Sequence, residues 1–362
     1  MKRLIAGTAA ALLAAVLVLP VNVDAISAQK AILLDASTGR VFYEKQADEQ
    51  SLIASTTKIM TALVVCEQCN VLDRVRIPKE AVGIEGSSMY LLEGEILTVQ
   101  ELLYGLMLHS GNDAAVALAI YCGGTVEGFA QLMNDKAHQL GLKNTHFENP
   151  NGLDAPGHHS TARDLAVLAA CAMENPIFAK TVSTKNVTIG QRYLRNHNKL
   201  LWQVEGADGV KTGYTRAAGR ILVSSAKREG RRLICVTINA PDDWQDHAAL
   251  LNSGFQDFSN CRIVAAGDCI GRVEIIGGQT SMAELMAVED FAYPLMDDER
   301  PQLVIPGPGF VYAPVVAGED AGFAHVCIDG KRIGTIPLIY GQTVEQVSEQ
   351  KESFWKRIFE GD

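Results

Sequence analysis

The pair formed by Ser55 and Lys58 is the first place in this chain where side chains at a fixed spacing could do chemistry. Apolar residues at helical spacing follow (Ile59, Met60 and Leu63), so a helix is predicted to begin here, with Lys58 one turn after Ser55 on the same face. A serine hydroxyl needs a base within hydrogen-bond distance. A lysine amine is such a base only where burial or nearby cations lower its pKa. Taken alone, this spacing more often marks a helix cap beside a solvated cation.

Two later segments could supply the partners that this pair lacks. Ser110-Gly111-Asn112 interrupts a helical block, and a tight turn there would project a hydroxyl and an amide into a cleft; the alternative is a helix C-cap. Lys211-Thr212-Gly213 begins a predicted strand pair, where glycine permits close approach of a ligand. Each segment is weak alone. The three together, spread over one domain's length of chain, indicate an active site.

The elements that must position these segments follow an α+β pattern. A β-hairpin is predicted at residues 30–44, and Thr98 with Glu101 forms a capping-box signature at the start of a helix. Strands, then a block of helices, then strands predict an antiparallel sheet with helices packed against it. Helices are predicted at 102–108, 114–121, 129–140, 165–173 and 243–255, and strands at 187–194, 220–225 and 233–240.

The predicted secondary structure changes after residue 258. Residues 259–342 read as short strands separated by turn residues, which predicts a small all-β sandwich behind a catalytic domain at residues 29–258. Residues 343–362 end in alternating aromatic, aliphatic and basic side chains around Trp355. They predict a C-terminal helix that contacts a membrane surface, and a helix packed on the β domain is the alternative.

Length and composition restrict the class of protein further. A chain of 362 residues can bury a large core and is expected to divide into two domains. Hydrophobic content of 48% and charged content of 20% describe an ordered globular protein. The net charge of -10 argues against nucleic acid as a partner. It leaves small substrates open, because a cationic pocket can lie on an acidic protein.

The N-terminal residues predict export. Lys2 and Arg3 precede an apolar run over residues 4–19, and small residues follow up to Ala25. We interpret residues 1–25 as a signal peptide cleaved after Ala25 or Ala28. A retained membrane anchor is the alternative, for which the run is short. The protein is expected at the extracytoplasmic face of the cell membrane or in the medium.

The eight cysteines suggest no nucleophile and no metal site. Cys66 and Cys69 have redox or zinc spacing, but no second pair or histidine cluster completes a site, so we expect no metal and no cofactor. In an exported protein, Cys66–Cys69 and Cys261–Cys269 are candidate disulfides.

The chain resembles the low-molecular-mass penicillin-binding proteins that are serine-type D-alanyl-D-alanine carboxypeptidases. The motifs S-x-x-K, S-D-N and K-T-G occur in this order in penicillin-binding proteins and class A β-lactamases, and the second motif here reads S-G-N. The resemblance covers residues 29–258 well and the β domain more weakly. It is carried by the runs at 54–62, 102–115, 133–137, 159–166 and 208–215.

The resemblance implies a catalytic role for three side chains. Ser55 would attack the bond between the two terminal D-alanines of a peptidoglycan stem peptide and form an acyl-enzyme. Lys58 would accept the proton of Ser55, and Ser110 would relay it to the leaving amine. Penicillins and other β-lactam antibiotics, which mimic the dipeptide, would inhibit the enzyme by trapping Ser55.

The resemblance also implies a set of substrate-binding residues. Asn112 would bind the substrate amide, and Lys211 with Thr212 would hold the terminal carboxylate. Gly213 and Tyr214 would continue the binding strand, with the backbone N–H groups of Tyr214 and Ser55 as the oxyanion hole.

One departure from the family concerns the terminal carboxylate. Many relatives place an arginine just before the final catalytic-domain helix, where residues 240–247 of this chain have none. Arg216 or Arg220, just after the Lys-Thr-Gly segment, would replace it, and Arg216 is included in the expected binding set.

Two other functions remain as alternatives to the carboxypeptidase. A class A-like β-lactamase would need a deacylating carboxylate, and no Glu-x-x-x-Asn occurs between Ser110 and Lys211. A non-catalytic penicillin-binding sensor would keep the acylated serine, which the intact motif residues disfavour. Transpeptidase or endopeptidase outcomes differ only in the peptides that the cleft admits.

Overall fold

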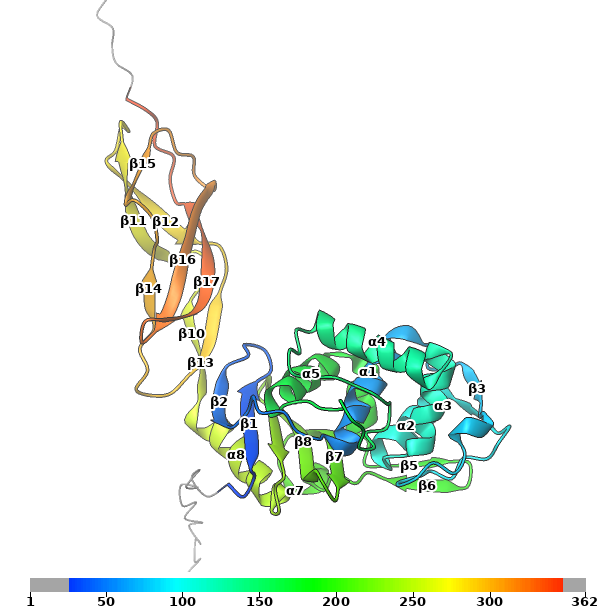
Figure 1. Cartoon of the computed structure of the whole chain (residues 1–362). Coiled ribbons are helices and arrows are strands. Elements are labelled where there is room, and N and C mark those ends of the chain that lie inside the picture. Colours follow the sequence, from blue (N-terminus) through cyan, green and yellow to red (C-terminus); the bar gives the residue numbers. More distant parts are fainter. Residues whose placement is uncertain (1–25, 348–362) are drawn as a thin grey trace, which may run out of the picture.

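The computed structural model describes residues 26–347, and these form two domains joined near residue 258 (Figure 1). The predicted signal peptide lies outside the described residues, as do residues 348–362 of the predicted C-terminal helix. Residues 343–347 are described and are not helical, because Val344 makes a β-bridge to Val315 of the β domain.

A five-stranded antiparallel sheet forms the centre of the catalytic domain, in the order β2-β1-β9-β8-β7. The predicted N-terminal hairpin is confirmed, and β1 pairs along its length with β9, so the two ends of the domain's chain meet in the middle of the sheet. The edge strand β7 carries the Lys-Thr-Gly segment. The strands are β1 (Lys30–Asp35), β2 (Val41–Lys45), β7 (Ala207–Thr215), β8 (Gly219–Arg228) and β9 (Arg231–Ile238).

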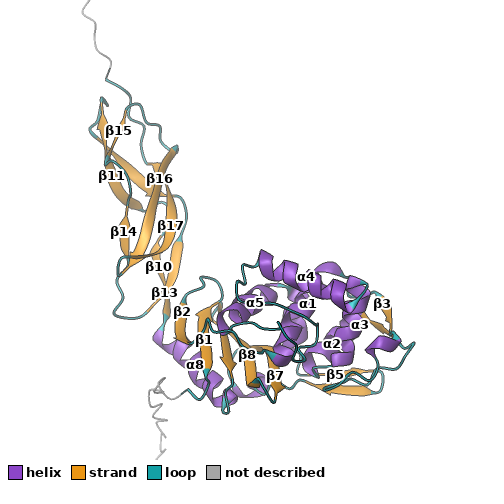
Figure 2. Cartoon of the chain, viewed as in Figure 1, coloured by secondary structure: helices purple, strands orange, loops and turns teal. Residues whose placement is uncertain are grey.

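Helices cover both faces of this sheet (Figure 2). On one face, Ile32, Val223 and Val236 join the main core with the helical block, and on the other, Leu250 and Leu251 of α8 (Asp243–Asp257) pack with Leu33. The predicted α+β architecture is therefore confirmed. The helical block consists of α1 (Lys58–Gln68), α2 (Val99–Leu108), α3 (Asn112–Gly123), α4 (Val126–Gln139), α5 (Ala162–Glu174) and α6 (Pro176–Ser183).

Local sequence signals explain several element boundaries. The capping box at Thr98 is confirmed, since its hydroxyl accepts the N–H of Glu101, whose carboxylate accepts the N–H of Thr98. The single strand predicted over residues 187–194 is wrong: the chain reverses at residues 190–191 and forms a hairpin. The remaining short elements are β3 (Arg74–Arg76), β4 (Ile96–Thr98), β5 (Asn186–Ile189), β6 (Arg192–Arg195), η2 (Ala54–Thr57), η3 (Lys79–Ala81) and α7 (Leu200–Gln203).

The accessory domain is built of β-strands, as predicted. Its six-stranded sheet has the order β14-β16-β17-β12-β11-β15, and the pair β10–β13 packs on it through a core that includes Val264 and Val326. Two strands, β12 and β13, were not predicted. The strands are β10 (Ser259–Val264), β11 (Cys269–Ile276), β12 (Met282–Ala287), β13 (Phe291–Leu295), β14 (Gln302–Val304), β15 (Phe310–Tyr312), β16 (Asp320–Ile328) and β17 (Lys331–Tyr340).

Arg40, in the β1–β2 turn, connects the two domains. Its guanidinium donates hydrogen bonds to the carbonyl of Pro294 and to Glu299. The same group lies 5.0 Å from the ring centroid of Phe258 and 5.2 Å from that of Tyr293. The accessory domain therefore projects from the β2 edge of the catalytic sheet (Figure 1).

All eight cysteines lie among the described residues and are free thiols, so neither candidate disulfide is formed. The side chain of Cys69 contacts that of Cys122. Within residues 26–347, no single helix is both long and apolar enough to cross a bilayer. Two pairs of consecutive helices, α3 with α4 and α5 with α6, reach the length and hydropathy of a membrane span when the two helices of a pair are taken together, and each pair is sharply bent. Both pairs contribute residues to the main core.

Candidate active site

Ser55 lies on the 3₁₀ turn η2 that leads into α1. The turn is held from beneath by the segment at residues 149–152, because Lys58 and Thr61 donate hydrogen bonds to the carbonyls of Asn151 and Pro150. Gly152 makes this approach possible. Its φ is +84°, and a Cβ at this position would lie 1.9 Å from the carbonyl oxygen of Ala54.

Lys58 is fully buried, and its amine faces Ser55. Its Nζ lies 2.9 Å from Ser55 Oγ, 2.6 Å from Asn112 Oδ1 and 2.6 Å from the carbonyl oxygen of Asn151. Burial, with a smaller contribution from the Lys211 cation, lowers the pKa of Lys58 well below its ordinary value, and Asp113 opposes this shift. The predicted contact between Ser55 and Lys58 is therefore present. Burial also gives the physical reason for the Lys58 amine to be neutral.

The Ser110-Gly111-Asn112 segment forms the predicted tight turn between α2 and α3. Ser110 adopts a φ of +62°, and Gly111 N–H donates to the Gly105 carbonyl at 3.0 Å. Asn112 is the first residue of α3, and its side chain is held on two sides: Oδ1 accepts from Lys58, and Nδ2 donates to the Glu85 carbonyl.

The neighbouring Asp113 is a positioning residue that the sequence analysis missed. Its carboxylate accepts hydrogen bonds from the N–H groups of Met89 and Leu91 and from the Ser88 hydroxyl. Asp113 therefore fixes the loop that borders Asn112. The only signal in the sequence was an acidic residue in the first turn of an apolar helix, directly after Ser110-Gly111-Asn112.

The Lys-Thr-Gly segment lies on β7, directly beside η2. Burial lowers the pKa of Lys211 to about 7, and its Nζ donates to the Thr212 carbonyl at 2.8 Å. A Cβ on Gly213 would lie 3.3 Å from both Ser55 N and Ala54 Cβ, so glycine allows the strand to approach Ser55 closely. Tyr214 follows with its side chain 68% exposed.

A cleft of about 320 Å³ opens over these groups. Ser55, Ser110, Thr212, Gly213 and Tyr214 line it, and the buried Lys58, Asn112 and Lys211 lie behind its wall. Arg216 is exposed in the β7–β8 turn and does not line the cleft. Arg220, the alternative to Arg216, does line the cleft, as do four residues that were not predicted: Ser87, His197, Asp243 and Trp244.

Arg220 of β8 lines the cleft, and its guanidinium contacts Asp243 and Trp244 of α8. Its Nη2 donates to Asp243 Oδ1 at 2.6 Å, and its guanidinium carbon lies 5.9 Å from the Trp244 ring centroid. Burial raises the pKa of the Asp243 carboxyl, and the bond from Arg220 opposes this shift. Arg220 pairs with Tyr214 across the β7–β8 hairpin, so hairpin register was the signal that could have placed it in the cleft.

Two histidines near the site are held neutral. Burial lowers the pKa of His197, in the cleft wall, to about 4, and the Lys211 cation adds to the effect. Burial also lowers the pKa of His158 to about 4. Since His158 Nδ1 accepts the N–H of Glu148, its Nε2 carries the proton and donates to Thr57 Oγ1 at 2.8 Å. His158 therefore supports the η2 turn without a charge.

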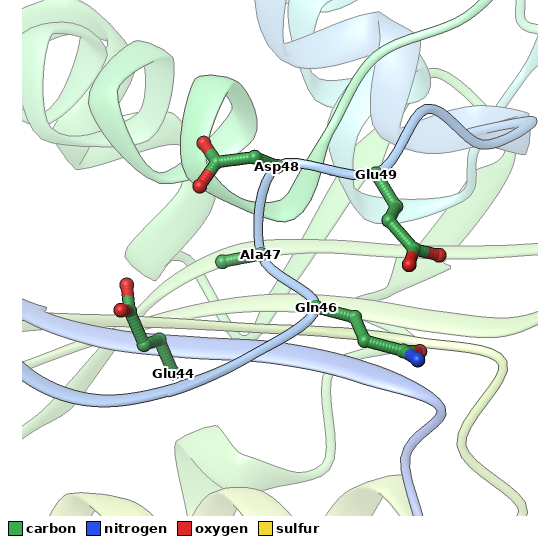
Figure 3. Close-up of a pocket in the computed structure, with 5 residues that line it drawn as sticks. All are labelled: Glu44, Gln46, Ala47, Asp48 and Glu49. Carbon is green, nitrogen blue, oxygen red and sulfur yellow. The ribbon is translucent and has the colours of Figure 1, made fainter.

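Another hollow, of about 430 Å³, lies in the loop after β2 and is shown in Figure 3. The carboxylates of Glu44 and Asp48 point to the same side of this loop (Figure 3), and both accept hydrogen bonds from Arg163 of α5. The bond from Arg163 holds the pKa of Asp48 below its ordinary value. The side chains that line this hollow include no nucleophile. The hydrogen bonds from Arg163 hold the loop against α5.

The cleft can support acyl transfer to a serine. It contains a hydroxyl beside a buried amine, a second hydroxyl at Ser110, and cations for an anionic substrate group. Asp243 is the one carboxylate among its lining residues and is paired with Arg220. Within residues 26–347, no group of His, Cys, Asp or Glu side chains is arranged to hold a metal ion.

Sequence comparisons agree with this chemistry. The family profile of Peptidase S11, D-alanyl-D-alanine carboxypeptidase, matches residues 18–242, and that of the penicillin-binding protein 5 C-terminal domain matches residues 258–346. D-alanyl-D-alanine carboxypeptidase DacF of Bacillus subtilis is 32% identical over 329 residues, which cover 86% of this chain and 84% of the relative. DacA of Escherichia coli is 32% identical over 345 residues, which cover 90% and 85%.

Solved structures share this fold, one over most of the chain and one over about two thirds of it. Penicillin binding protein 5 from Haemophilus influenzae aligns with a TM-score of 0.75 at 31% identity, covering 89% of this chain and 98% of that one. The Streptomyces K15 DD-transpeptidase aligns over 64% of this chain and 98% of its own length, with a TM-score of 0.62 and 37% identity. The chain belongs to the Peptidase S11 family of serine-type D-alanyl-D-alanine carboxypeptidases, and it carries the C-terminal domain of penicillin-binding protein 5.

Proposed function

We propose that the protein removes the terminal D-alanine from peptidoglycan stem peptides through an acyl-enzyme on Ser55. The contact between Lys58 Nζ and Ser55 Oγ, at 2.9 Å within a fully buried environment, carries this proposal. Because burial and the Lys211 cation disfavour the ammonium form, the amine of Lys58 can accept the Ser55 proton as the hydroxyl attacks. Water then hydrolyses the ester and restores the serine.

The remaining groups of the cleft stabilise the reacting atoms. Ser110 passes the proton to the leaving amine, since its turn holds it in the cleft wall beside Lys58's partner Asn112. The Asn112 amide has a second N–H besides the one bound by Glu85, and it holds the substrate amide carbonyl. The backbone N–H groups of Ser55 and Tyr214 form the oxyanion hole, and each such donor contributes ~10²–10³ in kcat.

The terminal carboxylate binds at Lys211, Thr212 and Arg220. Of the two arginines considered for this role, Arg216 and Arg220, we favour Arg220, because it lines the cleft and Arg216 does not. Asp243 and Trp244 fix one edge of the guanidinium, whose other donors stay free for a carboxylate. The anchor therefore comes from the β7–β8 hairpin, and α8 supplies its counter-charge.

β-Lactams acylate Ser55 in this proposal, and the adduct persists. A β-lactamase needs a free carboxylate to activate water, and the one carboxylate among the cleft-lining residues is bound to Arg220. The carboxypeptidase is therefore favoured over the β-lactamase alternative.

We also propose that the protein acts outside the cytoplasmic membrane after cleavage following Ala25. Residues 27 and 28 belong to the folded domain: both backbone N–H groups donate to Asp246, and Ala28 is fully buried. Cleavage after Ala28 would remove these contacts. Mass spectrometry of the secreted or membrane-associated protein tests this, and a mature N-terminus beyond residue 26 would contradict it.

The decisive experiment measures D-alanine released from a diacyl tripeptide ending in D-Ala-D-Ala. Wild-type protein should release it and Ser55→Ala should not. Equal release from both proteins, or none from wild type, would contradict the assignment. Fluorescent penicillin should label wild type stably, whereas rapid loss of the label would indicate a β-lactamase.

A further inference from the structure

Two of the eight cysteines, Cys69 and Cys122, contact each other in the catalytic domain. The sequence suggested Cys66 as the partner of Cys69, because residues three apart are neighbours on a helix. Cys69 is instead the C-cap of α1 and has extended backbone angles, φ -119° and ψ 148°, so its side chain leaves the helical row that contains Cys66. It meets the side chain of Cys122, in the last turn of α3.

The helices α1 and α3 touch at both of their ends. At the N-terminal ends, Lys58 Nζ donates to Asn112 Oδ1 at 2.6 Å. At the C-terminal ends, the thiols of Cys69 and Cys122 meet. The two helices therefore run side by side in the same direction over about 16 Å, the length of the 11 residues of α1 at 1.5 Å per residue. The thiol pair lies at the end opposite to the catalytic groups.

The surroundings of the two thiols hold them together and leave them accessible. Both side chains pack on the main hydrophobic core. Tyr121, next to Cys122, donates from its hydroxyl to Asp73 Oδ2 at 2.9 Å, which holds the loop after Cys69 against the end of α3. Cys69 and Cys122 are half-buried, and their neighbours Asn70 and Tyr121 are exposed. A reagent that reacts with thiols can therefore reach a pair that is already in place.

The acidities of the two thiols fit an exchange reaction in which Cys122 reacts first. The hydrogen bond from Cys69 lowers the pKa of the Cys122 thiol, and the same bond raises the pKa of Cys69. The thiolate is the form that attacks a disulfide. Export of the chain, which rests on the proposed function, would bring the pair into a compartment where disulfides form and persist.

We propose that Cys69 and Cys122 form a disulfide bond in the exported protein, and that this bond ties the C-terminal ends of α1 and α3 together. The oxidant is itself a disulfide, of a small thiol or of a thiol oxidoreductase. The Cys122 thiolate attacks one sulfur atom of the oxidant, forms a mixed disulfide and releases one thiol. Cys69 gives its proton to solvent, attacks the sulfur of Cys122 and releases the second thiol. Two electrons pass to the oxidant, which ends as two thiols.

The bond stabilises the site without taking part in its chemistry. Neither cysteine lines the catalytic cleft. The cross-link closes the loop from residue 69 to residue 122, which includes Ser110 and the whole of α2, so it restricts the unfolded chain. The oxidised protein should therefore keep its active site folded at temperatures at which the reduced protein loses it.

Incubation of the purified protein with a mixture of reduced and oxidised glutathione tests the bond. After the remaining thiols are alkylated, cleavage after Glu67 separates Cys66 from Cys69. Mass spectrometry should then find the Cys69 peptide joined to the Cys122 peptide, with the loss of two hydrogen atoms. Cys122→Ser should abolish this species, and Cys66→Ser, the matched control, should retain it. A bond between Cys66 and Cys69, or no bond between Cys69 and Cys122, would overturn the inference.

Thermal denaturation measures what the bond does. The oxidised protein should have a Tm about 5–10 °C above that of the reduced protein, and dithiothreitol should remove the difference. Cys122→Ser should have the same Tm in both conditions. Release of D-alanine at room temperature should agree within about twofold between oxidised and reduced wild type, since neither thiol lines the cleft.

A linked protein with the Tm of the reduced protein would overturn the proposed tie between α1 and α3. The linkage and the Tm are both measured without substrate. Absence of D-alanine release in wild type would therefore refute the proposed function alone and leave the result for the disulfide unaffected.

Discussion

Replacing Gly152 with alanine tests whether the turn beneath η2 sets the position of Ser55. A Cβ at residue 152 would lie 1.9 Å from the Ala54 carbonyl oxygen and 2.9 Å from Thr57 Oγ1, whereas real Cβ atoms essentially never come within 3.0 Å of such atoms. The turn or η2 must therefore separate by about 1.1 Å, the difference between 3.0 and 1.9 Å. A displacement of about 1 Å at a reacting group costs about 10²-fold.

The expected result is a fall of about 100-fold in kcat/KM for D-alanine release, with a parallel fall in the rate of acylation by fluorescent penicillin. Alanine at positive φ also costs roughly 1–2 kcal/mol of backbone strain, and stability must be separated from geometry. Gly230→Ala provides the matched control: Gly230 has the same φ of +84°, and a Cβ there meets nothing within 4 Å.

Both variants should lose the thermal stability that alanine at positive φ costs. Gly152→Ala should lose more, because of the contact with Ala54, and only Gly152→Ala should lose most of its activity. Thermal denaturation establishes that each variant is folded before kinetics are measured. Wild-type kcat/KM in Gly152→Ala, or an equal loss in Gly230→Ala, would refute the argument that residue 152 positions Ser55.

Three further predictions concern other parts of the molecule. Arg220→Gln should raise KM for D-Ala-D-Ala substrates at least about tenfold, because a charge-assisted carboxylate contact is lost, whereas Arg216→Gln should not; equal effects would contradict the assignment of the anchor. His247, fully buried between Ser224 and Thr237, has its pKa lowered by burial from 6.5 to about 3. Below pH 6.5 the unfolded chain therefore binds a proton that the folded chain excludes. The free energy of unfolding should fall as pH decreases from about 6.5 to about 3, and His247 should contribute about 1.4 kcal/mol per pH unit. Denaturant titrations of wild type and His247→Asn should give different slopes of unfolding free energy against pH, and identical slopes would refute this prediction. Arg40→Ala should leave D-alanine release unchanged and increase proteolysis near residue 258, since Arg40 loses its contacts with Pro294 and Glu299; unchanged proteolysis would show that other contacts hold the domains together.

The sequence was sufficient to single out the three segments that meet at the cleft, because each is marked by residues a few positions apart. Spacing placed Lys58 one turn from Ser55, and the capping box at Thr98 marked the start of α2, since both depend on residues three apart. Two short runs of strand-forming residues, separated by turn residues, identified the hairpin β1–β2 for the same reason.

Features that depend on distant segments were predicted only in part. The sequence offered Arg216 and Arg220 for the carboxylate and could not choose between them. Arg220 reaches the cleft because β8 pairs with β7 and because Asp243 comes from a later helix, which no local pattern specifies. Asp113 looked like an ordinary acidic residue at a helix start, although it binds a loop about 25 residues earlier in the chain. The strand expected over residues 187–194 was wrong because β-forming residues on both sides concealed the turn at residues 190–191.

The attachment of the accessory domain has a mechanical consequence. Arg40 holds that domain at the β2 edge of the sheet, and Ser55 lies beside β7 at the opposite edge. Three strands, β1, β9 and β8, separate the two edges, each hydrogen-bonded to its neighbours. A second connection is more direct, because α8 ends at Asp257, next to the domain junction, and begins at Asp243 and Trp244, which line the cleft. A displacement of the accessory domain should therefore reach the cleft first at Asp243, the partner of Arg220, and not at Ser55.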